Sequence, residues 1–167
     1  MMKQVNIGRI LLLGIGSDIL RDVGITSRLI NDLRARLPYE EIDYHSIYLG
    51  GLDLLEYIDG YRAVIFIDTI KTMKGDPGKI HFFSPENYWE TLHLSNRHDL
   101  SFSMTLELGK KLGFTLPVIM HVIAIEITED LEIGTGLSEE LNERYPEIRA
   151  EVERRIDKIY KETRMEI

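Results

Sequence analysis

Short runs of apolar residues alternate along the chain with segments in which apolar residues recur every three or four positions. The runs are typical of buried parallel strands, and the longer spacing is typical of helices that pack one face on a sheet. The runs predict strands at residues 10–13, 63–67 and 118–125, and weaker patterns predict two more at 41–47, near the sheet edge, and at 79–83. The helical spacing predicts helices near residues 25–37, 52–58, 100–112 and 148–159. This alternation predicts one α/β domain over residues 1–167 with a mostly parallel sheet.

Composition narrows the classes of function. The chain has 167 residues, no cysteine, and 20 basic against 28 acidic residues, a net charge of −8. The lack of cysteine excludes disulfides, thiolate metal sites and a cysteine nucleophile. The acidic balance argues against a nucleic-acid or anionic-membrane partner, because both require a basic surface. No apolar run approaches the roughly 20 residues that span a bilayer, and the polar N-terminus is unlike a signal peptide. We therefore expect a cytoplasmic protein, and a monomer because no coiled-coil seam is visible.

Common cofactor and hydrolase motifs are missing. Gly14 and Gly16 follow a predicted strand, as in a dinucleotide fingerprint, but Ile19 occupies the position of the third glycine. That glycine allows close helix–strand packing, so its loss argues against a dinucleotide pocket. The chain has no P-loop, no GxSxG elbow and no HExxH helix, and a conventional serine, cysteine or zinc hydrolase is therefore not indicated.

Polar residues at the ends of the predicted strands form the remaining candidate site. Asp18 and Asp22 follow the first strand, Asp68 follows residues 63–67, and His98 precedes a predicted helix. Ligands in open parallel sheets bind beyond the carboxyl ends of the strands. Carboxylates with an imidazole suit a borderline divalent metal such as nickel or zinc.

Each aspartate also has a structural interpretation. Asp22 is a possible N-cap for a helix from Gly24 onward, and Asp68 a loop residue that bonds nearby amides. We expect Asp99 to be the N-cap of the helix that starts near Leu100. His98 lies just outside that cap and has no such duty. For the other histidines we expect ordinary surface or core roles; these are His45, His81, His93 and His121.

Four blocks of the sequence resemble, in the same order, four blocks of the hydrogenase maturation proteases. The first is a glycine-rich turn with an acid and a glycine, and the second is an apolar strand with Asp and a Pro-Gly loop. The third is a His before a helix, and the fourth is a strand with the turn into the final helix. They are residues 13–24, 65–80, 98–113 and 122–138.

The resemblance implies a phosphorylase/hydrolase-like three-layer α/β sandwich with a twisted, mostly parallel five-stranded sheet. It also implies an aspartic-type endopeptidase that removes a short C-terminal peptide from the large subunit of a nickel–iron hydrogenase after nickel insertion. The partner is then the large-subunit precursor. The nickel arrives bound to that precursor, with another divalent metal as the alternative.

In the family, an acid of the first block, the Asp of the second and the His of the third contact the metal. Carried over, these positions are Val23, Asp68 and His98. Valine cannot ligate a metal, so we expect Asp22 or Asp18 to substitute. The candidate metal contacts are therefore Asp68, His98, Asp22 and Asp18, and the candidate catalytic residues are Asp68 and Asp22.

Two other functions are compatible with the sequence. The valine at position 23 favours a non-catalytic, chaperone-like protein that recognises the nickel-loaded precursor without cutting it. A small-molecule hydrolase that uses the same end of the sheet is the third possibility.

Overall fold

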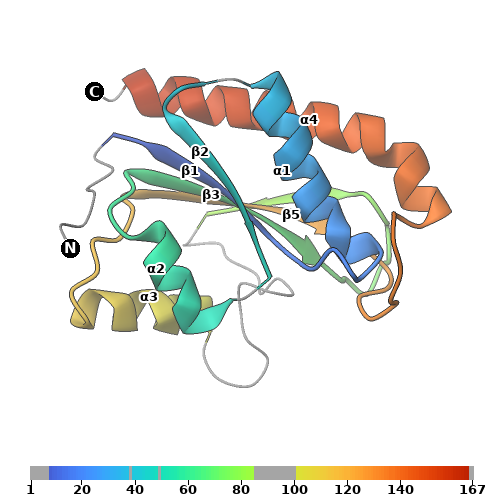
Figure 1. Ribbon diagram of the computed structural model, residues 1–167, viewed down its shortest axis with the longest axis horizontal. Coiled ribbons are helices and arrows are strands. Elements are labelled where there is room, and N and C mark those ends of the chain that lie inside the picture. The colour runs from blue at the N-terminus through green and yellow to red at the C-terminus, as the bar shows by residue number, and fades with distance from the viewer. Residues whose placement is uncertain (1–7, 38, 49, 85–100, 166–167) are drawn as a thin grey trace.

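A twisted five-stranded sheet forms the centre of the protein, with strand order β2-β1-β3-β5-β4. The computed structural model describes residues 8–37, 39–48, 50–84 and 101–165 (Figure 1). The strands are β1 (Ile10–Ile15), β2 (Ile42–Ile47), β3 (Ala63–Ile70), β4 (Ile80–Phe83) and β5 (Ile119–Glu126). Four of them pair in parallel, and β4 joins β5 antiparallel at one edge. The predicted sheet is confirmed, including the edge position of β2.

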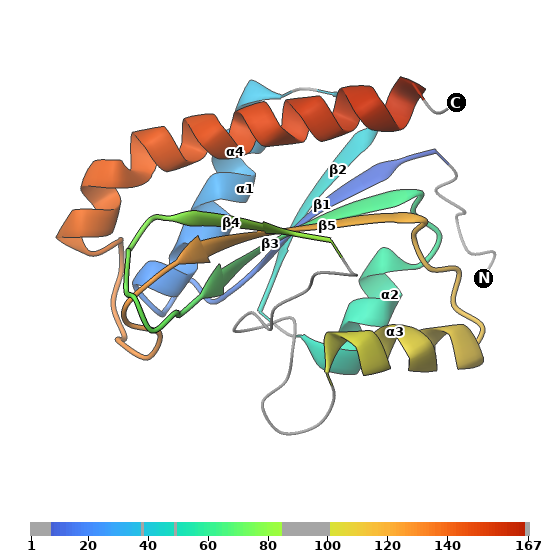
Figure 2. The ribbon, with the colours of Figure 1, turned by 180° about the vertical axis from the view of Figure 1, so that it is seen from behind.

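Helices cover both faces of the sheet. Helices α1 (Ile25–Arg36) and α4 (Glu139–Met165) lie on one face, and α2 (Leu54–Ile58) and α3 (Phe102–Lys111) lie on the other (Figures 1 and 2). This arrangement confirms the three-layer α/β sandwich. Within the described ranges, no helix combines the length and the apolar character needed to cross a membrane.

The start of α3 differs from the prediction. The helix begins at Phe102, and the Ser101 hydroxyl accepts a hydrogen bond of 3.3 Å from the Met104 amide as its N-cap. The predicted cap at Asp99 is therefore wrong. Serine and aspartate are both good caps, and the apolar spacing alone did not separate two candidates that are two residues apart.

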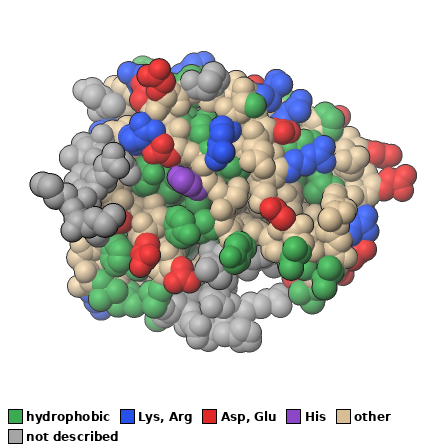
Figure 3. Space-filling view, in the orientation of Figure 1, with side chains coloured by type: hydrophobic (Ala, Val, Ile, Leu, Met, Phe, Trp, Pro, Cys, Tyr) green, Lys and Arg blue, Asp and Glu red, His purple; other side chains and the backbone are tan. Residues whose placement is uncertain are grey.

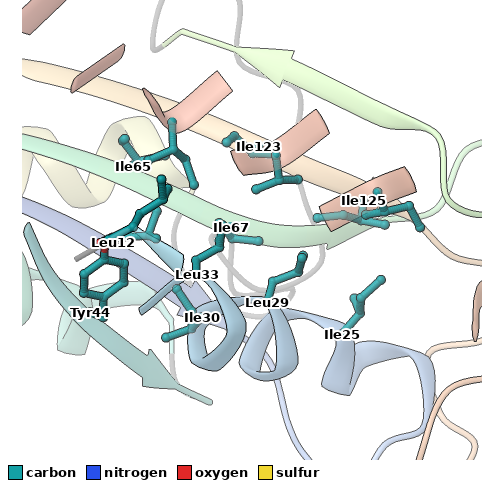
Figure 4. Packing of buried hydrophobic residues seen from close by; sticks show 14 of the residues in the cluster. Leu12, Ile25, Leu29, Ile30, Leu33, Tyr44, Ile65, Ile67, Ile123 and Ile125 are labelled. Carbon is teal, nitrogen blue, oxygen red and sulfur yellow. The ribbon is translucent and has the colours of Figure 1, made fainter. Parts of the chain in front are cut away.

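Strand β3 divides the core into two clusters. Its residues alternate between the faces, so Ile65 and Ile67 pack with α1 and α4 while Val64 and Phe66 pack with α2 and α3. Figure 4 shows the first cluster, in which side chains of α1 meet those of the strands. All eight residues of β3 are buried, which explains why its sequence is almost continuously apolar.

Candidate functional site

Asp68 is a fully buried carboxylate near the carboxyl end of β3. Its side chain has 0% exposure, and Oδ1 accepts a hydrogen bond of 2.7 Å from the Thr69 amide. The strand continues to Ile70, so the loop expected for Asp68 in its structural interpretation is wrong, whereas the expected bond to a nearby amide is present. By alternation, Asp68 lies on the face of Val64 and Phe66, which α2 and α3 cover.

Asp22 is also buried, and its carboxylate forms a hydrogen bond between the segment before α1 and the segment before α4. Its Oδ1 accepts a hydrogen bond of 2.6 Å from the Ser138 amide, directly before α4. Helix α1 has Gly24 as its N-cap residue and no side-chain cap. The N-cap role considered for Asp22 is therefore wrong, and the carboxylate ties the β1–α1 connection to the start of α4. A carboxylate at a helix N-terminus is electrostatically favourable.

Asp18 is exposed at the edge of an open hollow of about 400 Å³. Arg21, Arg28 and Leu137 also line the hollow. The Arg21 guanidinium is paired with the Glu132 carboxylate at 2.7 Å. The side chain of Asp18 thus lies at a polar surface, between the β1–α1 connection and the segment that precedes α4.

Val23 belongs to the core. It has 0% exposure and packs in the cluster of α1 and α4. The turn before it is tight, since a Cβ atom on Gly16 would lie 2.7 Å from the Val23 carbonyl oxygen and 2.5 Å from the Thr26 hydroxyl. Gly16 therefore serves close packing of this turn.

Backbone hydrogen bonds join the connection after β1 to the connection after β5. Leu20 and Ile133 form an isolated antiparallel bridge. The Arg21 amide donates to the Glu132 carbonyl at 3.0 Å, and the Gly134 amide donates to the Ile19 carbonyl at 3.0 Å. The two connections thus form one continuous surface at the carboxyl end of the sheet.

Large apolar side chains are exposed around this end of the sheet. They lie on the segments that follow the four parallel strands, and three of them lie on the joined connections. They are Ile19, Tyr48, Met73, Leu131 and Ile133, with exposures of 67%, 75%, 107%, 74% and 79%. Figure 3 shows apolar side chains at the lower right of this face, over the connections that follow β1 and β5 in Figure 1. We call these five residues the apolar rim.

A pair formed by the buried Glu126 and the half-buried His81 near Asp68 was missed by the sequence analysis. Glu126 ends β5 with 1% exposure, and its Oε2 lies 2.9 Å from Nε2 of His81 on β4. Its Oε1 accepts hydrogen bonds from the Thr72 hydroxyl and, at 3.1 Å, from the Asp76 amide. The available signal was an acid at the end of an apolar strand. The partner histidine is 45 residues away in the chain, so the ordinary role expected for His81 rested on its local context alone.

The described carboxylates do not gather into a ready metal site. Across the described ranges, no three His, Asp or Glu side chains are placed to hold a metal ion by themselves. Asp68 is buried on one face of the sheet, Asp22 is bonded to Ser138, and Asp18 is exposed. His98 lies outside the described residues. The substitution of Asp22 or Asp18 for the missing acid stays a prediction.

Known proteins of one kind are similar to this chain. A sequence profile of the hydrogenase maturation proteases (HycI) matches residues 28–163, and no curated protein sequence is a significant match. The hydrogenase maturating endopeptidase HybD from E. coli is similar in structure, with a TM-score of 0.63 and 22% identity over 86% of this chain and 89% of that one. The maturation protease HycI from Thermococcus kodakarensis has a TM-score of 0.61 and 18% identity over 88% and 91% of the two chains.

An archaeal structure extends this similarity. The hydrogenase 2 maturation peptidase from a Thaumarchaeota archaeon has a TM-score of 0.59 and 20% identity, over 89% of this chain and 98% of that chain. At these identities the structural comparisons establish a shared fold.

Proposed function

Because this chain belongs to the hydrogenase maturation protease family, we propose that it is the endopeptidase that removes the C-terminal peptide of a nickel–iron hydrogenase large subunit after nickel insertion. The observation that carries the proposal is the position of Asp68. It is a fully buried carboxylate near the carboxyl end of β3, which is the end where open α/β sheets bind ligands. The nickel belongs to the substrate, and Asp68 and His98 complete its coordination.

The apolar rim supports a protein substrate over a small molecule. Its five side chains lie on the segments that follow the four parallel strands, at the end of the sheet near which Asp68 lies, and they are exposed to 67% or more. Exposed apolar side chains that cluster around a site mark a surface for another macromolecule. A folded precursor can cover the rim while its C-terminal segment lies over the end of the sheet near Asp68.

The cleavage is a hydrolysis in which water attacks the carbonyl carbon of the scissile peptide bond. The substrate's nickel, contacted by Asp68 and His98, would act either as a template that positions this bond or as a Lewis acid that polarises its carbonyl. Asp68 contributes a carboxylate whose position is fixed by burial and by the Thr69 amide. Such a fixed group positions the substrate metal without the entropic cost of ordering a mobile side chain.

A processing assay tests this proposal. The purified chain is mixed with nickel-loaded large-subunit precursor, and mass spectrometry scores the loss of the C-terminal peptide. Cleavage is expected to require nickel and to be abolished in Asp68→Ala. Glu162→Gln is the matched control, because it removes an exposed carboxylate near the far end of α4. Normal cleavage by Asp68→Ala would overturn the assignment of this site.

One observation favours a second function. Val23, at the position where the family carries an acidic metal contact, is fully buried in the core. A protein that lacks this contact can recognise the nickel-loaded precursor without cutting it. In the same assay, a stable complex with intact precursor would support this recognition function.

A further inference from the structure

The Glu126 carboxylate is a fixed anion at the end of β5. It is 1% exposed, and hydrogen bonds from Thr72, Asp76 and His81 occupy both of its oxygens. Burial raises the pKa of Glu126, but the hydrogen bonds from Thr72, His81 and the Asp76 amide lower it, and the net pKa is below the ordinary value. The carboxylate is therefore ionised near neutral pH and only accepts hydrogen bonds.

This anion determines which nitrogen of His81 carries a proton. Since Glu126 only accepts, Nε2 of His81 must donate the 2.9 Å bond. In the neutral ring the lone pair is then on Nδ1, and no described residue forms a hydrogen bond with that atom. The ring also stacks on Phe83, with centroids 6.2 Å apart and planes at 8°. A carboxylate that orients a histidine, and so fixes which ring nitrogen keeps the lone pair, is an arrangement found in hydrolytic sites.

The sheet places His81 beside Asp68. Both residues pair with Ala124, Asp68 from β3 and His81 from β4. Paired residues project to the same face of a sheet, and two strand spacings separate the two Cα atoms by about 10 Å. The intervening Ala124 has only a methyl group, so no large side chain of β5 separates the carboxylate from the imidazole.

We propose that His81, oriented by Glu126, is the general base that activates the attacking water. This inference rests on the proposed function. As the water oxygen bonds to the carbonyl carbon of the scissile peptide, Nδ1 takes one proton from that water. The same proton passes to the peptide nitrogen as the C–N bond breaks, which releases a neutral amine and returns the imidazole to its starting state. Glu126 acts through His81 and is a positioning residue.

The kinetics of cleavage of the nickel-loaded precursor test the role of His81 as the general base. His81→Ala and His81→Gln are expected to lower kcat by about 100-fold or more, with KM and precursor binding unchanged. Glu126→Gln is expected to lower kcat by about 10-fold, as for other residues that orient a histidine. His45→Ala is the control, because His45 is an exposed histidine on β2 at the opposite sheet edge. Added imidazole should partly restore cleavage by His81→Ala, which a merely structural histidine would not allow.

Nitrogen NMR of the free protein gives a readout that does not depend on cleavage. The His81 ring should show a protonated Nε2 and an unprotonated Nδ1 at a pH where the ring is neutral, and Glu126→Gln should mix the two tautomers. Cleavage at the parent rate by folded His81→Gln would overturn the base while leaving the protease function in place. Failure of the parent chain to cut any precursor would overturn the proposed function, and with it the base.

Discussion

The carboxylate of Asp22 accepts a hydrogen bond of 2.6 Å from the backbone amide of Ser138, 116 residues later in the chain. The bond joins the first connection of the sheet to the start of the last helix. Asp22 therefore has a structural role through Oδ1, and any role at the substrate metal would have to share the carboxylate with this bond.

Two substitutions separate these roles. Asp22→Ala leaves the Ser138 amide without its acceptor and should lower the free energy of unfolding by about 1–2 kcal/mol. Asp22→Asn keeps an oxygen acceptor and should lose less, as measured by urea unfolding. If Asp22→Asn is stable and still processes precursor at the parent rate, its carboxylate charge has no catalytic role.

The apolar rim should govern the affinity for the precursor. Replacing Leu131 and Ile133 with serine removes two exposed apolar contacts and should weaken precursor binding by about 10-fold or more, if each contributes about 1 kcal/mol. The fold should be unaffected, because both side chains are more than 70% exposed.

Val118→Ser is the control for the rim. Val118 is 88% exposed but lies just before β5, at the opposite end of the sheet from the rim. Binding measured by titration calorimetry should be unchanged in this variant. Equal loss of binding in the control and in the rim variant would contradict the location of the interface.

An acidic residue at position 23 should destabilise the fold. Val23→Glu buries a carboxylate in a fully enclosed apolar site and should lower the free energy of unfolding by about 3 kcal/mol or more. Val23→Ile, which keeps the side chain apolar, is the comparison. If Val23→Glu is as stable as the parent and cuts faster, position 23 opens toward the substrate metal in the working complex.

The turn after β1 should tolerate alanine at one glycine and not at another. A Cβ atom on Gly16 would lie 2.7 Å from the Val23 carbonyl oxygen, whereas on Gly24 the nearest atom would be 3.7 Å away. Gly16→Ala should therefore lower the free energy of unfolding by about 1–3 kcal/mol. Gly24→Ala should be neutral or stabilise by about 0.5 kcal/mol. Equal thermal unfolding temperatures for the two variants would contradict the tight turn.

Asp43 should make stability depend on acid pH. Its carboxylate accepts hydrogen bonds from the Arg9 guanidinium at 2.8 Å and from the Tyr61 hydroxyl at 3.0 Å. The bond from Arg9 lowers the pKa of Asp43 most; burial opposes this, and Tyr61 adds to the lowering. A lowered folded-state pKa stabilises the protein above the ordinary Asp value of about 3.9, and this stabilisation is lost as pH falls through the folded-state pKa.

Urea unfolding at pH 6 and at pH 3 checks this dependence. The parent chain should lose more stability between these pH values than Asp43→Asn, which cannot ionise at this position. Identical losses in the two proteins would contradict the lowered pKa.

The order and type of the strands and helices were predictable because each depends on local apolar spacing, but helix starts were not: α3 begins at Phe102 and α4 at Glu139. The end of β3 was not, since Asp68 and Thr69 interrupt the apolar run although both are buried in the strand. Parallel pairing with β5 over residues 63–70 extends the strand past them, and this partner is distant in the chain.

The candidate site was predictable only where residue type and strand end coincide. Asp68 met that condition in position, because it lies near the carboxyl end of β3, and its role at the metal stays a prediction. The bond of Asp22 to Ser138 could not be predicted, because the two residues are 116 positions apart. The bond between Glu126 and His81 could not be predicted either, because they are 45 positions apart. Local context assigned Asp22 a helix cap and His81 an ordinary role, and only the folded chain shows their partners.

The joined connections after β1 and β5 have a consequence for how such proteins diverge. The bonds that hold them, Arg21 to Glu132 and Gly134 to Ile19, run between backbone atoms. Side chains such as Ile19 and Ile133 can therefore be exchanged while the backbone keeps its shape. Relatives with this fold can acquire preferences for different partners by changing these side chains, with little risk to folding.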